Sequence, residues 1–285
     1  MTMIKVDGKK LAADIRANVA KQVSDIKKQG GSLFFVAVQV GDDPASNIYI
    51  ETKRKNCKEV GIKMQVIKLP ASTTQDTLNN TLAKISKRKS VCGILLQLPL
   101  PKHLDSCAAV ENITPYKDVD GLTLASFGRL AAGGDIALAP CTALGVLHIL
   151  KKHSINLTGA NAVVIGRSNI VGKPTAMLLQ KENATVTVCH SHTKDLKLYT
   201  KKADVVVVAA GRRGILTGEM IKKGAAVIDV GINRIEGKIY GDVDYDSVAK
   251  KAKLLTPVPG GVGPLTVAFL LKNIVSAYEL SLKEG

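Results

Sequence analysis

Two residues four positions apart, Tyr49 and Lys53, could hold and transfer a proton if one helix carries both. The segment "PASNIYIETKRKNCKEV" predicts such a helix over residues 44–60, because Pro44 suits its first turn and either of the two preceding aspartates can cap it. Helical spacing then places both side chains on one face. A lysine that is partly desolvated beside a phenol would have a lowered pKa and could shuttle protons; a solvated lysine on a helix surface is the alternative.

Further polar residues stand in two other motifs. Gln97 interrupts the apolar run "GILLQLPLP", where a buried amide needs hydrogen-bond partners. It is either a satisfied core residue or a group that faces a cleft and orients a catalytic side chain. Asp118 and Asp120 precede Gly121 in the loop "KDVDGL". One carboxylate there could cap a turn, and one could accept two parallel hydrogen bonds from an amidine-like edge of a ligand.

The segment "GRSNIVGKPT" (166–175) looks like a phosphate-binding loop but fits neither common pattern. Gly166 and Gly172 are one residue too far apart for a P-loop, Pro174 replaces the hydroxyl residue, and the second glycine of GxGxxG is absent. A buried strand nevertheless precedes the loop and a helix follows it, and such a helix N-terminus offers backbone N–H groups to an anion. We therefore expect a nucleotide here; a plain turn is the alternative.

The strand that follows, "ATVTVC", bears on which nucleotide binds. Domains that select NAD usually carry an acidic residue at the end of this strand to hold the ribose 2′-hydroxyl. Here the strand ends in His190, Ser191 and His192, without a carboxylate. Arg167 in the first loop offers a guanidinium that suits a 2′-phosphate. The sequence therefore favours NADP over NAD.

Strands and helices alternate around these residues. Apolar runs predict buried parallel strands at 33–41, 64–70, 92–101 and 161–166. This rhythm implies an α/β protein of two βαβ-type domains with parallel sheets, the second a Rossmann-like NADP-binding domain. We expect the domains at 1–120 and 140–263 with a linker at 121–139. A C-terminal helix over about 264–285 should pack back on the first domain.

Composition narrows the class of protein. The 285 residues, 46% hydrophobic, suffice for two cores. No run approaches the roughly 20 consecutive apolar residues of a membrane span, and the start has no signal-peptide core, so we expect a cytoplasmic protein without membrane association. Five widely spaced cysteines without CxxC argue against disulfides and zinc, and the close pair His190 and His192 is too few ligands for a metal.

The formal net charge of +16 permits a polyanionic partner. The lysines are scattered over amphipathic helices, however, and no Trp, six Tyr and four Phe leave few platforms on which bases could stack. We therefore expect no nucleic-acid partner. Solvated helix faces explain such a charge, and attraction of polyanionic small ligands is the alternative explanation.

As an ordered set, the motifs resemble the bifunctional methylenetetrahydrofolate dehydrogenase/cyclohydrolase family. The matching stretches run nearly end to end and include "VGDDPASNIYIETKRK", "GILLQLPLP", "KDVDGL", "PCTALG", "VVIGRSNIVGKPTAMLL", "TVCHSHT", "DVGIN", "GDVD" and "TPVPGGVGPLTVAFLLKN". One position departs, because Ala143 follows Thr142 where the family usually has a second proline. We expect this change to loosen the local loop.

The resemblance implies that 5,10-methylenetetrahydrofolate is oxidised with NADP+ and that the methenyl product is hydrolysed to 10-formyltetrahydrofolate, in a cleft between the domains. Lys53 would transfer protons in the hydrolysis, Gln97 would orient Lys53, Tyr49 would pack on the folate and Asp120 would grip the pterin edge. The cofactor would lie beside Gly166, Arg167, Ser168, Ser191 and Ile232, and the folate beside Pro259, Gly260 and Gly261. The family is typically homodimeric, and its folates can carry a polyglutamate tail.

Three alternative functions remain. Another two-domain NADP dehydrogenase, acting on a hydroxy acid, is disfavoured by "KDVDGL" together with "PVPGGVGP". A basic RNA-binding protein is disfavoured by the scarcity of aromatic residues. A monofunctional relative that has lost the hydrolase is disfavoured by the presence of both Lys53 and Gln97.

Overall fold

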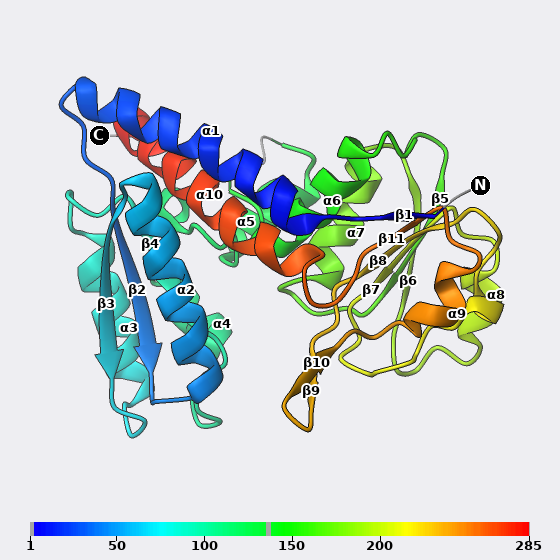
Figure 1. Ribbon diagram of the computed structural model, residues 1–285. Helices are drawn as coiled ribbons and strands as arrows, with labels where there is room; N and C mark the ends of the chain where they lie inside the picture. The colour runs from blue at the N-terminus through cyan, green and yellow to red at the C-terminus, as the bar shows by residue number, and fades with distance from the viewer. Residues whose placement is uncertain (1–2, 135–137, 285) are drawn as a thin grey trace. The chain divides into compact units, whose positions relative to one another are not determined.

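The computed structural model describes residues 3–134 and 138–284, and the chain divides into two compact units (Figure 1). One unit comprises residues 13–141 together with the chain from Val267 onward, and contains a sheet of three strands. The other comprises the chain up to Ala12 and residues 142–266, and contains a sheet of six strands. They are called the three-stranded unit and the six-stranded unit below.

The three-stranded unit alternates strands and helices in the order β2 (Phe34–Val40), α2 (Pro44–Val60), β3 (Lys63–Leu69), α3 (Gln75–Ser86), β4 (Gly93–Leu96) and α4 (Ser106–Val110). The sheet is parallel, with β2 in the middle. Because side chains alternate along a strand, Val36, Val38 and Val40 share one face and pack in a core with residues of α3 and α4. Gln39 points to the opposite face, where its amide donates to Asn47 of α2.

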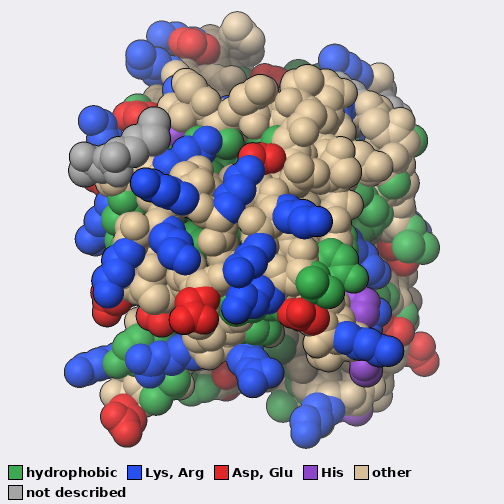
Figure 2. Space-filling model, turned by 90° about the vertical axis from the view of Figure 1, so that its right-hand side faces the viewer, with side chains coloured by type: hydrophobic (Ala, Val, Ile, Leu, Met, Phe, Trp, Pro, Cys, Tyr) green, Lys and Arg blue, Asp and Glu red, His purple; other side chains and the backbone are tan. Residues whose placement is uncertain are grey.

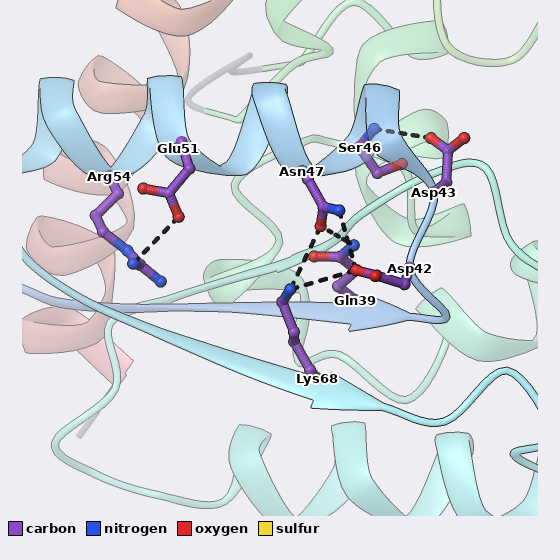
Figure 3. A network of polar contacts seen from close by, with 8 residues as sticks. All are labelled: Gln39, Asp42, Asp43, Ser46, Asn47, Glu51, Arg54 and Lys68. Atoms are coloured by element: carbon purple, nitrogen blue, oxygen red, sulfur yellow. Dashed lines mark hydrogen bonds and ion pairs between the residues drawn. The ribbon is translucent and has the colours of Figure 1, made fainter.

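Helix α2 has the bounds that the sequence predicts, because both of its ends are capped. Of the two candidate aspartates, Asp43 is the N-cap, and its carboxylate accepts a 2.7 Å hydrogen bond from the Ser46 backbone N–H (Figure 3). Gly61 ends the helix in the left-handed conformation, at φ 81°. Asp42 instead accepts from the Asn47 amide and pairs with Lys68 at 3.5 Å, which ties the start of α2 to β3.

Two long helices, α1 (Gly8–Lys28) and α10 (Val262–Glu284), run alongside each other (Figure 1). A Cβ atom at Gly8 would collide with the Gly261 carbonyl, so the two backbones approach closely there, and one at Gly31 would collide with the hydroxyl of the Tyr278 side chain on α10. By length and composition α10 could cross a membrane, but 56% of its apolar window is buried inside the protein. Packing therefore accounts for its apolar character.

The six-stranded unit holds β1 (Ile4–Lys5), α6 (Cys141–Lys152), β5 (Asn161–Ile165), α7 (Gly172–Lys181), β6 (Thr185–Cys189), α8 (Leu196–Thr200), β7 (Val205–Val208), β8 (Ala226–Asp229), α9 (Tyr245–Ala249) and β11 (Leu254–Leu255). The strand order is β1-β11-β8-β7-β5-β6, and every neighbouring pair is parallel. From β5 the chain first adds β6 on one side and then crosses to add β7 on the other side. This is a doubly wound order, and its switch point lies at β5. The expected α/β class with parallel sheets and a Rossmann-like second domain is confirmed.

Some elements differ from the expectation. The strand expected over 92–101 stops at Leu96, since Pro99 and Pro101 beyond it have no backbone N–H to offer a neighbouring strand. An antiparallel hairpin of β9 (Asn233–Ile235) and β10 (Lys238–Tyr240) was not expected. Glu236 and Gly237 form its tight turn, and both have positive φ. The glycine is the sequence signal that could have revealed this hairpin.

The ends of the expected first domain also differ. Strand β1 pairs with β11, so the first twelve residues belong with the six-stranded unit. The expected linker at 121–139 contains helix α5 (Leu124–Ala131), capped by Thr123; residues 135–137 lie outside the described residues. Ala143 lies fully buried in the first turn of α6. The expectation of a loosened loop there is wrong, since alanine favours a helix.

Candidate active site

A lysine–glutamine pair joins helix α2 to the end of strand β4 in the three-stranded unit. The Nζ atom of Lys53, on α2, donates a 2.8 Å hydrogen bond to Oε1 of Gln97, directly after β4. The Gln97 side chain is 7% exposed, and its Nε2 donates to the Leu98 carbonyl at 2.6 Å. Both polar ends of this amide are therefore engaged, so its oxygen is aimed at the lysine. Of the two interpretations of Gln97, the structure supports the one in which it orients another side chain.

The surroundings of Lys53 disfavour its charged form. Burial lowers the pKa of the ammonium group, and the negative charge of Asp120 offsets part of that shift. Burial likewise raises the pKa of the Asp120 carboxyl, against the opposing effect of Lys53. The site therefore holds a lysine that gives up its proton more readily than a solvated one, which a proton-transfer residue requires.

The two aspartates of "KDVDGL" have different surroundings. Asp118 is almost fully buried, and its Oδ2 accepts 2.8 Å hydrogen bonds from the Thr123 N–H and the Ser126 hydroxyl at the start of α5. Asp118 is thus the carboxylate that caps a turn. Asp120 is electrostatically coupled to Lys53 instead. The structure brings Lys53, Gln97 and Asp120 together, and their expected roles toward folate stay predictions.

Tyr49 lies one helical turn before Lys53 on α2 and remains 39% exposed. An aromatic ring that is open to solvent beside the lysine can pack against a flat ligand. The start of α2 is fixed by the network in Figure 3, where the Asn47 oxygen accepts from Gln39 of β2 and from Lys68 of β3. Both strands therefore hold the helix that presents Tyr49 and Lys53.

Cys141 belongs to this cluster, although sequence reasoning weighed it only as a disulfide or zinc residue. Burial and the nearby Asp120 raise the pKa of its thiol well above the ordinary value, so it stays protonated, and its Sγ donates a 3.5 Å hydrogen bond to the Val119 carbonyl. The buried amide of Asn273 on α10 donates to the carbonyls of Val119 and Ala139, at 2.9 and 3.0 Å. It thereby holds the two loops that carry Asp120 and Cys141. The motifs "PCTALG" and "LLKN" contained these residues, but only the fold reveals the contacts.

The residues expected at the cofactor lie along one edge of the six-stranded sheet. The register pairs Ile165 with Cys189 and with Val208, and Val208 with Asp229, so β5, β6, β7 and β8 end in line. Gly166–Ser168, Ser191 and Ile232 follow directly after three of these strands. In doubly wound sheets, ligands bind outside the carboxyl ends of the strands at the switch point. The sheet thus presents these residues where a nucleotide would bind.

Two glycines shape the loop after β5. Gly166 has φ 122°, and a Cβ atom there would collide with the Ala209 carbonyl; a Cβ atom at Gly172 would collide with the Gly166 carbonyl. The loop therefore folds closely between β7 and the start of α7, as a phosphate-binding turn requires. The Ser168 hydroxyl accepts from the N–H groups of Val171 and Gly172, at 3.2 and 3.4 Å, and so stabilises the loop itself.

The remaining predicted residues are exposed or lie elsewhere in this unit. Arg167 and Ser191 are exposed, and Ile232 is 49% exposed, which leaves all three available to a ligand. Pro259, Gly260 and Gly261 follow β11, with Gly260 at φ 103°. Their expected contact with folate stays a prediction. Among the residues that the structure describes, no three His, Cys, Asp or Glu side chains form a group that could hold a metal ion.

A doubly wound sheet with an open switch point, and a second unit with a desolvated lysine, define a two-domain, nucleotide-dependent α/β enzyme. The family "Tetrahydrofolate dehydrogenase/cyclohydrolase, catalytic domain" matches residues 6–120, and its "NAD(P)-binding domain" matches residues 140–282. The chain belongs to the tetrahydrofolate dehydrogenase/cyclohydrolase family.

Individual relatives agree over nearly the whole chain. The bifunctional protein FolD of Brevibacillus brevis is 49% identical over 280 residues, which covers 98% of each chain. The crystal structure of the bifunctional enzyme FolD from Campylobacter jejuni has a TM-score of 0.96 at 46% identity, and covers 98% of this chain and 99% of that one. The Trypanosoma brucei enzyme, solved with NADP cofactor and an inhibitor, has a TM-score of 0.95 at 36% identity and covers 99% of each chain.

Proposed function

We propose that this protein oxidises 5,10-methylenetetrahydrofolate to 5,10-methenyltetrahydrofolate with NADP+ and then hydrolyses that product to 10-formyltetrahydrofolate. Family membership supports both reactions. The observation that carries the hydrolytic activity is the 2.8 Å hydrogen bond from Lys53 to Gln97, in surroundings that lower the pKa of the lysine.

In the hydrolysis, Lys53 acts as the proton-transfer residue. The uncharged amine accepts a proton from water as the water oxygen bonds to the methenyl carbon. The ammonium then returns that proton to N5 as the C–N5 bond breaks, and the hydroxyl proton of the adduct leaves as the formyl group forms. A positively charged methenyl substrate repels an ammonium, which further favours the neutral amine before attack. Gln97 keeps the Lys53 nitrogen oriented throughout.

On the same substrate, Tyr49 packs against the pterin and Asp120 grips its amidine-like edge. A carboxylate can accept two parallel hydrogen bonds from such an edge, which fixes the orientation of the ring.

The edge of the six-stranded sheet binds NADP. Gly166 and Gly172 permit the close approach of the loop backbone, and the N-terminus of α7 favours a phosphate. Arg167, exposed beside the end of β6, recognises the 2′-phosphate together with Ser191. NADP+ held by these residues would supply the acceptor for the hydride that leaves the methylene carbon of the substrate.

We further propose that the enzyme is a cytoplasmic homodimer that takes folates with or without a polyglutamate tail, and that it binds neither nucleic acid nor membrane. Strand β6 lies at a sheet edge and exposes Val188, and such an edge can pair with a second copy. The mass in solution tests the dimer.

Figure 2 shows Lys and Arg side chains spread over one face with Asp and Glu between them. This distribution suits a general attraction of polyanionic ligands more than a groove for nucleic acid.

One assay tests the two activities together. The purified protein is given methylenetetrahydrofolate and NADP+, and NADPH, the methenyl product and the formyl product are followed in time. We expect NADPH and the methenyl product to appear first and the formyl product to follow. Methenyl product without enzyme-dependent formyl product would indicate a monofunctional dehydrogenase, and turnover of a hydroxy acid without folate would refute the proposal.

A further inference from the structure

The motif "GDVD" contains a buried carboxylate that has no part in the functions described so far. Asp242 is 0% exposed. Its Oδ2 accepts hydrogen bonds from the backbone N–H groups of Ala210 and Gly211, at 2.7 and 2.8 Å. Its Oδ1 accepts from the amide of Asn233 at 2.8 Å. A single side chain therefore joins the loop after β7 to the segment after β8.

The loop after β7 borders the switch point of the sheet, and the segment after β8 follows the neighbouring strand. Ala210 and Gly211 are exposed, although their N–H groups donate to the buried carboxylate of Asp242. Ala209, directly before them, is the residue whose carbonyl leaves no room for a Cβ atom at Gly166. The loop that Asp242 holds thus begins in direct contact with the phosphate loop. Asn233 follows Ile232, which is the residue expected beside the cofactor.

A second buried carboxylate fixes Asp242 itself. Asp229, at the end of β8, accepts from the backbone N–H groups of Gly231, Asp242 and Val243 at 2.9, 3.0 and 3.0 Å. A Cβ atom at Gly231 would collide with the Asp242 carboxyl, and one at Gly241 would collide with the Asp229 carboxyl. The carboxyl groups therefore fill the space beside these glycines. Asp242 cannot shift without disturbing the end of β8.

We propose that Asp242 is a positioning residue of the dehydrogenase reaction, which fixes the Ala210–Gly211 backbone as one wall of the nucleotide crevice. This inference rests on the proposed function, since it requires NADP to bind at the switch point. Without the carboxylate, the exposed loop has no buried acceptor for its two N–H groups. The cofactor would then have to order the loop on binding, which weakens affinity. Hydrolysis of the methenyl substrate consumes no NADP and is not affected by this loss.

The variant Asp242→Asn tests the role at constant size. An amide has a single acceptor oxygen, so its NH2 group faces either the loop N–H groups or the Asn233 amide, and a donor meets a donor in both orientations. We expect the dissociation constant and the KM for NADP+ to rise about tenfold, as the loss of a buried hydrogen bond implies. The kcat of hydrolysis, measured with supplied methenyl substrate, should stay within about twofold of that of the unaltered protein, because hydrolysis does not require bound NADP.

The matched control is Asp244→Asn, which makes the same change on an exposed aspartate two residues away and should leave both activities unchanged. A merely structural role of Asp242 would lower the two activities in parallel, and that result would overturn the inference. If Asp242→Asn fails to fold, Asn233→Ala decides, since it removes the 2.8 Å bond from the other segment and should also weaken NADP+ selectively.

The outcomes also separate this inference from the proposed function. NADP+ binding is measured by calorimetry on the unaltered chain and on each variant. Absence of binding by the unaltered chain would overturn the proposed function and this inference with it. Binding by the unaltered chain that persists undiminished in the folded variants would overturn the inference alone.

Discussion

The Nζ atom of Lys53 donates its 2.8 Å hydrogen bond to an uncharged amide oxygen of Gln97, not to a carboxylate. A carboxylate as direct acceptor would stabilise the ammonium and keep it charged. The amide orients the nitrogen while burial lowers the pKa of Lys53. This pairing therefore lets the lysine be both well placed and readily deprotonated.

Replacement of Lys53 by alanine should abolish hydrolysis of the methenyl substrate, because the proton-transfer group is lost. General acid–base groups typically contribute about 10²- to 10⁴-fold in rate, which sets the expected loss. The control is Lys55→Ala, which removes an exposed lysine of the same helix. Circular dichroism should show both variants folded; undiminished hydrolysis by folded Lys53→Ala would refute the role.

The rate of hydrolysis should rise with pH through the lowered pKa of Lys53 and then level off, since the neutral amine accepts the proton. In Gln97→Glu, a carboxylate faces the ammonium and raises its pKa toward or above the ordinary value. The rising limb of the pH–rate profile should then move to higher pH, and the rate near neutrality should fall. A profile of kcat against pH that does not move between the two proteins contradicts this account.

Arg167→Ala should weaken NADP binding by about tenfold or more while NAD binding changes little, because a charge-assisted hydrogen bond to the 2′-phosphate is lost. Dissociation constants for both nucleotides provide the measurement. Arg129→Ala, which removes an exposed arginine of the three-stranded unit, controls for the change in net charge. Equal losses for NADP and NAD would count against contact with the 2′-phosphate.

Substitution of Asp118 should mainly lower the stability of the protein, whereas substitution of Asp120 should mainly affect its activity. Asp118→Ala leaves the Thr123 N–H and the Ser126 hydroxyl without their buried acceptor and should lower the free energy of unfolding by about 2 kcal/mol. Asp120→Asn keeps the shape of the side chain and should raise the KM for folate with little change in unfolding. Denaturant titration and steady-state kinetics on both variants test these two expectations. If Asp118→Ala mainly raised the KM and Asp120→Asn mainly lowered the stability, the assigned roles would be wrong.

Short-range patterns were enough to predict the elements that carry the chemistry. The bounds of α2 follow from Asp43, Pro44 and Gly61, residues that act within one turn of where they stand. The i and i+4 spacing of Tyr49 and Lys53 is likewise a property of the helix alone. Strands β5 and β7, which flank the phosphate loop, were predictable because each is a short and mostly apolar run.

Local physical reasoning about single motifs does not indicate that the substrate is a folate. The loop after β5 predicts an anion, and the end of β6 without an acid predicts a 2′-phosphate. Only the ordered set of motifs, by resemblance, indicated the substrate, and family membership then supported it.

By itself, the sequence determined the kind of fold, the helix that bears Lys53 and the edge that would bind a nucleotide, because these depend on neighbours within about one helical turn or one strand. Tertiary structure alone decided which aspartate caps a turn and which meets the lysine, that β1 joins β11, and that Asp242 holds Ala210 and Gly211. Those contacts join residues far apart in the chain. Their partners are set by strand order and register, which no local pattern encodes.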